Sequence, residues 1–190
     1  MTRTVARQLA VQIGFSVANE PARAPEALDA FLDEEYFASL ACENELFAEY
    51  PSKKQQDYIR AIVLGTAEHA RELDAYIEKY ARGWKLSRIS RIALTILRTA
   101  LFEVMYMENV PDSVAINEAV ELAKGFEEPE TVSFINGILG SFMRGERGSD
   151  PLPEYRPEAE TEISEPEAEA PEEETPEASE ETSREPSEEQ

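Results

Sequence analysis

The chain has 190 residues, with 18 lysines and arginines against 40 aspartates and glutamates, one histidine, one cysteine and a formal net charge of −22. This length and composition indicate one domain with an appendage. A single cysteine excludes an intrachain disulfide, and the sequence has neither a signal-like start nor an apolar run long enough to span a membrane. We therefore expect a cytoplasmic protein that does not act at a membrane.

The acidic residues are distributed unevenly. Residues 1–147 contain 16 basic and 23 acidic residues, whereas residues 148–190 contain 2 basic and 17 acidic residues and seven prolines. The second segment has only Leu152, Tyr155 and Ile163 as sizeable apolar side chains, so burial cannot offset the entropy of ordering it. We predict a domain over 1–147 and a disordered, Glu/Pro-rich acidic tail over 148–190.

Apolar residues recur at helical spacing throughout the first segment, between the prolines that interrupt it. A first helix over about 3–18 places Val5, Leu9, Ile13 and Val17 on one face, at successive steps of four residues. No run of alternating β-branched residues is present, so the pattern predicts an all-α domain. The other expected helices cover about 25–40, 53–80 and 86–106. A further helix starts after a turn capped by Asp112 or Ser113 and ends at Gly125, and the last one runs from Pro129 through Phe142.

The inventory of reactive side chains argues against an enzyme. The single histidine, His69, lies on an apolar stripe, and no nucleophile-elbow, phosphate-loop or paired-cysteine motif is present, so we expect no cofactor and no small-molecule substrate. Glu68, His69 and Glu72 share one helical turn, but nothing supplies the remaining ligands of a metal site. We therefore expect a histidine at the edge of the core, and we expect Cys42 to be a small core or half-exposed residue.

The first helix carries a second stripe formed by Arg3, Arg7, Val11 and Phe15. At 100° per residue this stripe lies away from the apolar face, which predicts that the two arginines and the aromatic ring point outward. Such a surface can stack an unpaired base on Phe15 while the guanidinium groups bind phosphates. The alternative is that the arginines form a solvated helix face and that Phe15 fills a groove.

Several motifs between residues 84 and 143 occur together in one order. Combined with the run from Ala6 to Gln12 in the first helix, they resemble the NusB family of transcription antitermination factors over about residues 3–143. The motifs are Leu97-Arg98, Glu103, Ile116-Asn117-Glu118-Ala119, Leu122-Ala123-Lys124 and Phe134-x-Asn136-Gly137-x-Leu139.

The resemblance implies an all-α domain of two helical subbundles that binds the boxA element of nascent RNA. It implies two protein partners, the ribosomal small-subunit protein NusE and the RNA polymerase antitermination complex, and read-through of terminators in ribosomal RNA operons. The RNA face implied for this chain consists of Arg3, Arg7, Phe15, Glu130 and Phe134. The polar motif residues Arg98, Glu103, Asn117, Glu118 and Asn136 lie among apolar neighbours, so we expect them to form a satisfied internal network.

Two other functions remain open at this level. The domain can be a protein-interaction adaptor that holds a ribosomal or polymerase component without direct RNA contact, or a regulatory domain for a separate catalytic chain. The acidic tail is either a solubilising appendage or a competitor of RNA for the Arg3 and Arg7 face.

Overall fold

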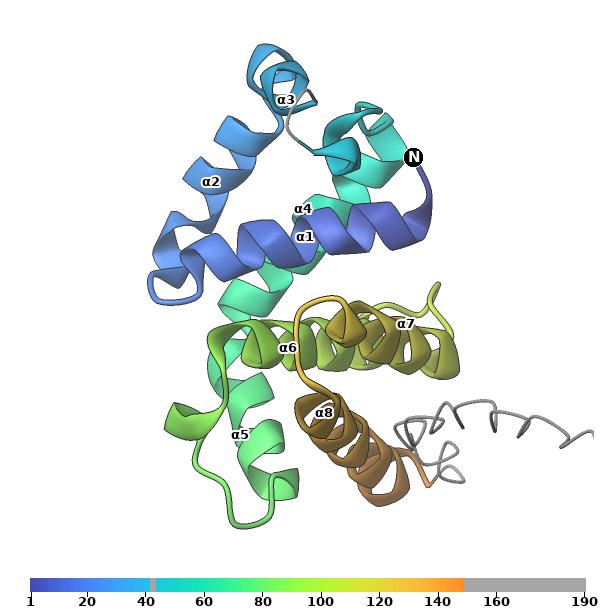
Figure 1. The fold of residues 1–190 in the computed structure, drawn as a ribbon. Coiled ribbons are helices and arrows are strands. Elements are labelled where there is room, and N and C mark those ends of the chain that lie inside the picture. Colours follow the sequence, from blue (N-terminus) through green and yellow to red (C-terminus); the bar gives the residue numbers. More distant parts are fainter. Residues whose placement is uncertain (42–43, 149–190) are drawn as a thin grey trace, which may run out of the picture. The chain divides into compact units, whose positions relative to one another are not determined.

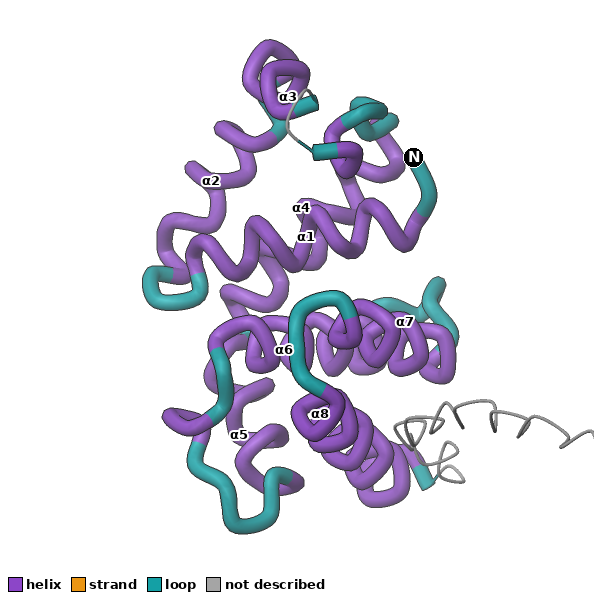
Figure 2. Tube along the Cα trace, viewed as in Figure 1, coloured by secondary structure: helices purple, strands orange, loops and turns teal. Residues whose placement is uncertain are grey.

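The computed structural model describes residues 1–41 and 44–148, and within these residues the fold is entirely helical (Figures 1 and 2). Cys42 and the predicted tail lie outside the described residues. None of the described helices is long and apolar enough to cross a membrane. The elements are α1 (Arg3–Val17), η1 (Pro21–Arg23), α2 (Ala24–Phe31), α3 (Glu34–Leu40), η2 (Glu45–Phe47), α4 (Lys53–Glu68), α5 (Ala70–Tyr80), η3 (Leu86–Arg88), α6 (Arg91–Tyr106), α7 (Asp112–Lys124), α8 (Pro129–Phe142) and η4 (Met143–Arg147).

The helices form two packed groups that share α6. In the first group α1 packs against α2 and α4, and in the second group α6 packs against α5, α7 and α8 (Figure 1). Both α1 and α4 also contact α6. The helix α6 has ten buried residues, including the carboxylate of Glu103, because neighbours cover it on several sides. The expectation of an all-α domain is confirmed.

The expected helix over 25–40 is two helices in the structure. The chain leaves the helical conformation at Leu32, and the side chain of Asp33 accepts a hydrogen bond from the backbone N–H of Tyr36 at 2.9 Å. This bond caps the free N–H groups at the start of α3. Apolar spacing alone did not distinguish one helix from two, because the apolar stripe continues through Tyr36 in the sequence. In the structure the break turns Tyr36 outward to 46% exposure, and Phe37 is buried in its place.

The expected helix over 53–80 is also divided, at His69. The hydroxyl of Thr66 donates to the carbonyl of Ile62 at 2.7 Å, a local bond of the kind that bends helices, and His69 itself leaves the helical conformation. The break allows α4 to pack with α1 while α5 packs with α6 and α8. A single straight helix would contact only one of the two groups along its whole length.

The structure places His69 at this joint and half-buried. Its Nδ1 lies 3.2 Å from a carboxylate oxygen of Glu72, and the same oxygen accepts a hydrogen bond from the Tyr106 hydroxyl at 2.6 Å. The histidine ring packs against the ring of Tyr106, with a centroid separation of 4.2 Å. Over residues 1–41 and 44–148 no group of three His, Cys, Asp or Glu side chains is arranged to hold a metal ion.

The start of α7 differs from the expected capped turn. The helix begins at Asp112 after Pro111, and neither Asp112 nor Ser113 provides a side-chain cap. Proline fixes the backbone before the first turn, so the helix starts without a capping hydrogen bond. The prediction of a cap by either residue was therefore wrong, although the position of the turn was correct.

Close packing of α4 on α6 depends on a glycine. A Cβ atom at Gly65 would lie 2.0 Å from the Phe102 ring, which is 7% exposed and stacks on Tyr106. We expect Gly65→Ala to lower the free energy of unfolding by about 1–3 kcal/mol, because the ring has little room to move. Urea unfolding measures this change, and Phe102→Leu in the same chain should restore part of it. An unchanged stability for Gly65→Ala would contradict this packing.

Candidate nucleic-acid interface

Arg7 lies in a buried cluster between α1 and α6. Its guanidinium group makes two hydrogen bonds of 2.8 Å to the two carboxylate oxygens of Glu103, and a third of 2.7 Å to Glu118 on α7. The hydroxyl of Tyr58 on α4 donates to Glu103 at 2.7 Å. Arg7 is 2% exposed and Glu103 is fully buried. These four side chains therefore join α1, α4, α6 and α7 through one network of charge-assisted hydrogen bonds.

The electrostatics of the cluster favour the ionised pair. Burial by itself lowers the pKa of Arg7, but the hydrogen bonds and negative charge of Glu103 outweigh burial and raise it. Burial raises the pKa of the Tyr58 hydroxyl, and the charge of Glu103 raises it further. Arg7 thus stays charged, and Tyr58 stays a hydrogen-bond donor, over the whole physiological pH range.

This arrangement corrects the prediction that the second stripe of α1 points outward. Arg7 and Val11 are both buried because α6 covers the side of α1 that the pattern assigned to solvent. The groove beside Arg7 also contains the carboxylates of Glu118 and Glu121, which would repel a phosphate. RNA contact by Arg7 stays a prediction, and in this geometry its direct role is structural.

The expected internal polar network is present only in part. Besides the Arg7 cluster, Arg98 makes two hydrogen bonds of 2.8 Å to the carboxylate of Asp74 on α5. Asn117, however, is exposed, and Asn136 is half-buried with no side-chain hydrogen bond to another described residue. The prediction was therefore wrong for the two asparagines, because their positions on α7 and α8 lie outside the cluster.

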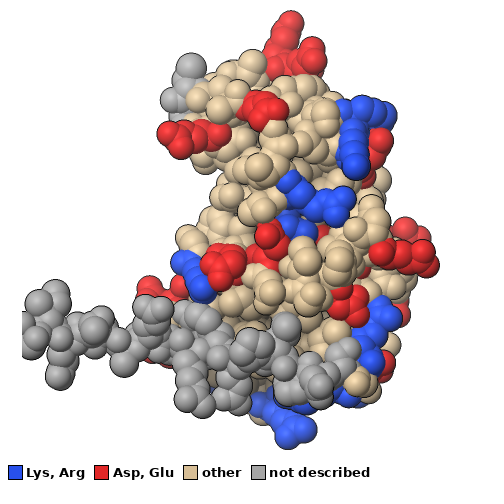
Figure 3. All heavy atoms as spheres, turned by 90° about the vertical axis from the view of Figure 1, so that its right-hand side faces the viewer, with Lys and Arg blue, Asp and Glu red and all other residues tan. Residues whose placement is uncertain are grey.

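Arg3 is the exposed cation of α1. It lies near the N-terminal end of the helix, its guanidinium carbon is 5.5 Å from the centre of the Tyr58 ring, and it lines a shallow groove with Lys54 of α4. Figure 3 views this side of the molecule and shows basic atoms in the hollow between the two helical groups. The position is accessible to a phosphate.

Phe15 lies near the other end of α1, against the start of α6. The guanidinium carbon of Arg91 is 4.0 Å from the centre of its ring, a cation–π contact that joins the two helices. Phe15 is half-buried and Arg91 is exposed. The guanidinium group of Arg91 therefore lies over the face of the Phe15 ring.

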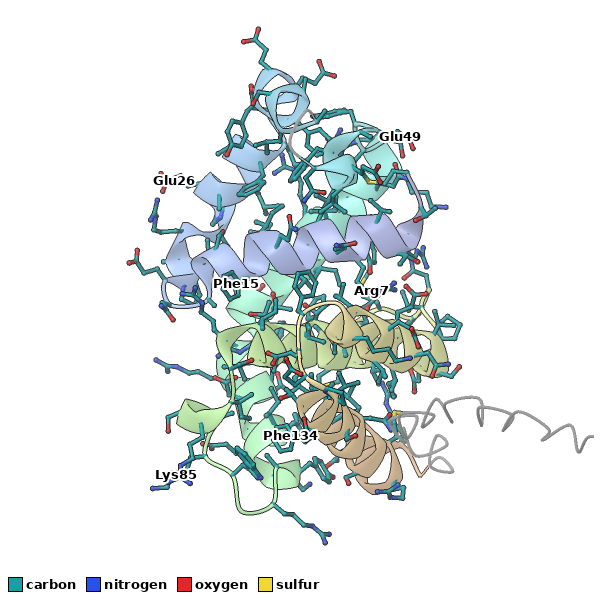
Figure 4. The ribbon with its side chains drawn as sticks, viewed as in Figure 1. Arg7, Phe15, Glu26, Glu49, Lys85 and Phe134 are labelled. Carbon is teal, nitrogen blue, oxygen red and sulfur yellow. The ribbon has the colours of Figure 1, made fainter. Side chains whose placement is uncertain are left out.

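An aromatic pair connects α8 with the segment that precedes α6. Phe134 on α8 packs against Trp84, with ring centroids 5.1 Å apart, and Trp84 is 52% exposed. Figure 4 shows Phe134 and Lys85 in the second helical group, Phe15 near the C-terminal end of α1, and Arg7 nearer its N-terminal end. Gly83, which has a φ of 79°, turns the chain immediately before Trp84.

The segment that carries Trp84 is strongly basic. Residues 79–98 contain six basic and no acidic residues. Two of the six are paired: Arg98 with Asp74, and Lys79 with Glu146. The other four are exposed and form no ion pair among the described residues. They are Arg82, Lys85, Arg88 and Arg91.

We call the surface formed by Phe15, Trp84, Lys85, Arg88, Arg91 and Phe134 the basic-aromatic strip. It combines unpaired cations with accessible π-faces, the combination that binds single-stranded nucleic acid. The sequence pattern pointed to Phe15 and Phe134 but not to the basic residues around Trp84. Trp84 itself lay in the gap between the helices expected over 53–80 and 86–106. The signal was present, because a run of six basic residues without an acidic one surrounds an exposed tryptophan.

Glu130 borders this strip. It is exposed in the first turn of α8, where the partial positive charge of the helix N-terminus stabilises a carboxylate. Glu130 lies four residues before Phe134 on α8, Arg3 lies near the N-terminal end of α1, and Arg7 is enclosed.

Comparison with known proteins gives a consistent family. Residues 4–144 match the model of the NusB family. The chain is 37% identical over 149 residues to the transcription antitermination protein NusB of Symbiobacterium thermophilum, covering 78% of this chain and 94% of that protein. It is 35% identical over 144 residues to the NusB protein of an Exiguobacterium species, covering 76% and 98% of the two chains.

Other matches are shorter or structural. The NusB protein of Acetivibrio thermocellus is 47% identical over 93 residues, which cover 49% of this chain and 64% of that relative. This chain therefore matches slightly less than two thirds of that protein's length. The solved structure of T. maritima NusB superposes with a TM-score of 0.57 at 23% identity, covering 76% of this chain and 92% of that one, and so shows the same fold.

Proposed function

The chain belongs to the NusB family, and we propose that it acts as a transcription antitermination factor that binds boxA RNA together with NusE. In this role the domain holds the single-stranded boxA element while RNA polymerase reads through terminators of ribosomal RNA operons. The observation that supports RNA contact most directly is the basic-aromatic strip, with its unpaired cations beside Trp84 and Phe134.

The proposed RNA face extends the one implied by the resemblance. Phe134 and Trp84 supply stacking surfaces, and Arg91 presents its guanidinium group over Phe15. Lys85 and Arg88 neutralise phosphates, and Arg3 adds a cation near the N-terminal end of α1. Arg7 holds α1 against α6 and thereby positions the face. A charge reversal at Arg7 therefore disturbs folding first, and is a poor test of RNA binding.

Charge-neutralising variants of exposed cations provide a cleaner test. We expect the combined variant Lys85→Gln, Arg88→Gln and Arg91→Gln to bind a boxA-like RNA more weakly than the native chain. A plot of the logarithm of affinity against the logarithm of salt concentration has a negative slope. This slope should become less steep, by about 0.7 for each phosphate contact removed. Fluorescence anisotropy with labelled RNA, with and without NusE, measures both quantities.

The matched control is Arg23→Gln, which removes an exposed arginine on η1 that is paired with Glu20 and Glu26. This variant should leave the RNA affinity and its salt slope unchanged. If the combined variant also leaves both unchanged in the presence of NusE, the RNA role of the strip is wrong. The chain would then be a protein-interaction adaptor without direct RNA contact.

A further inference from the structure

A groove opens between α3 and η2, at the end of the first helical group and away from the basic-aromatic strip (Figures 1 and 4). Its volume is about 380 Å³, and the proposed RNA function makes no use of it. The lining residues are Glu34, Phe37, Ala38, Ala41, Phe47, Ala48 and Tyr50.

The floor of the groove is aromatic and fixed in place. Phe37 and Phe47 are buried, and the Phe37 ring meets both Phe47 and Tyr50 edge to face, with centroid separations of 5.1 Å and 5.2 Å. The Tyr50 hydroxyl donates a hydrogen bond of 2.5 Å to the carbonyl of Leu32, at the end of α2. An apolar ligand therefore meets a surface that is already ordered, which lowers the entropic cost of binding.

The walls above this floor are low. Ala38, Ala41 and Ala48 are exposed and present only methyl groups, and the half-buried Tyr50 is the more accessible aromatic side chain of the lining. Larger side chains at these three positions would close the groove. The shape thus fits one large apolar side chain of a ligand that lies across α3 and η2.

The surroundings of the groove are strongly acidic. Residues 19–50 contain nine acidic residues and one basic residue, whereas the rest of residues 1–147 contains 14 acidic and 15 basic residues. Figure 3 shows acidic atoms at the end of the molecule that α3 forms. The acidic residues of the domain are therefore enriched in the segment that contains both α3 and η2.

Glu34 lines the groove, and two further carboxylates lie on the two elements that form it. Glu34 and Glu35 on α3 and Glu45 on η2 are exposed and form no ion pair within the described residues. Other acidic residues of this region are already paired, such as Asp29 with Arg60. The sign of this charge disfavours a nucleic acid, and it disfavours a second copy that presents the same acidic face.

We propose that this groove binds a segment of a partner protein in which one large apolar side chain is flanked by lysines or arginines. The apolar side chain contacts Tyr50 and the alanine methyl groups, which the buried rings of Phe37 and Phe47 support from below. The flanking cations pair with Glu34 on one wall and Glu45 on the other. Because the groove lies away from the basic-aromatic strip, this partner and RNA bind at the same time.

The test uses the full chain and a short fluorescein-labelled peptide with a central phenylalanine between two Lys-Arg pairs. We expect Glu34→Lys combined with Glu45→Lys, and separately the groove-filling change Ala48→Phe, each to weaken peptide binding about tenfold or more. The matched control combines Glu68→Lys with Glu108→Lys, which makes the same charge change at exposed, unpaired sites on other parts of the domain. This control should bind the peptide like the native chain.

A second peptide, with serine in place of phenylalanine, should bind much more weakly to the native chain. Four results would overturn the proposal: no peptide binding, equal binding of the two peptides, equal loss in the groove and control variants, or a dimer in sedimentation that Glu45→Lys dissociates. RNA affinity measured on the same variants should be unchanged, so that failure here is distinct from failure of the proposed RNA function. Circular dichroism confirms that each variant is folded.

Discussion

Replacing Arg7 by alanine is expected to lower the free energy of unfolding by about 3–5 kcal/mol. The change leaves the fully buried carboxylate of Glu103 with only the Tyr58 hydroxyl as a partner, and it separates α1 from the α6 surface that it covers. An uncompensated charge in the interior costs far more than the loss of an exposed ion pair. Urea unfolding followed by far-ultraviolet circular dichroism measures the change.

A second variant separates the buried charge from the loss of packing. Arg7→Met combined with Glu103→Leu removes both charges and keeps similar volumes, so it should be considerably more stable than Arg7→Ala. The control Arg23→Ala, at an arginine that is 61% exposed, should change stability by no more than about 0.5 kcal/mol. If Arg7→Ala unfolds at the same urea concentration as the Arg23 control, the buried cluster does not stabilise the fold as described.

Replacing Trp84 by alanine is expected to weaken binding of a boxA-like RNA by about tenfold, because stacking contributes ~1–3 kcal/mol per base. Trp84 is half-exposed beside Phe134 and four unpaired cations. Trp84→Phe should retain most of the affinity, since it preserves a π-face. The control is Tyr36→Ala, which removes an aromatic side chain that is 46% exposed but lies on α3, at the acidic end of the domain.

The native chain offers a direct signal for the same contact. Trp84 is its only tryptophan. A base stacked on the indole should quench its fluorescence when boxA-like RNA is added, and the Lys85, Arg88 and Arg91 variant should require more RNA for the same quenching. Unchanged emission at saturating RNA would show that Trp84 does not stack on a base.

Charge is segregated along the domain in a way that links the two proposed binding functions. All charged residues within 79–98 are basic, whereas residues 19–50 carry nine acidic residues and one basic residue. A fold that separates these segments can hold an RNA on one and a basic protein segment on the other. The net charge of the whole chain conceals this polarity, because the acidic residues outnumber the basic ones.

The sequence by itself determined the helical class, the family and most helix positions, because these depend on local spacing and on motifs that occur in order along the chain. It also singled out Phe15 and Phe134 as candidate RNA contacts. Only the tertiary structure decided which face of α1 is buried. Helical periodicity describes one helix at a time, and α1 is covered on two sides because α4 and α6 belong to different helical groups. That second contact encloses Arg7 with Glu103, and the division of the long helix at His69 lets both groups form around α6.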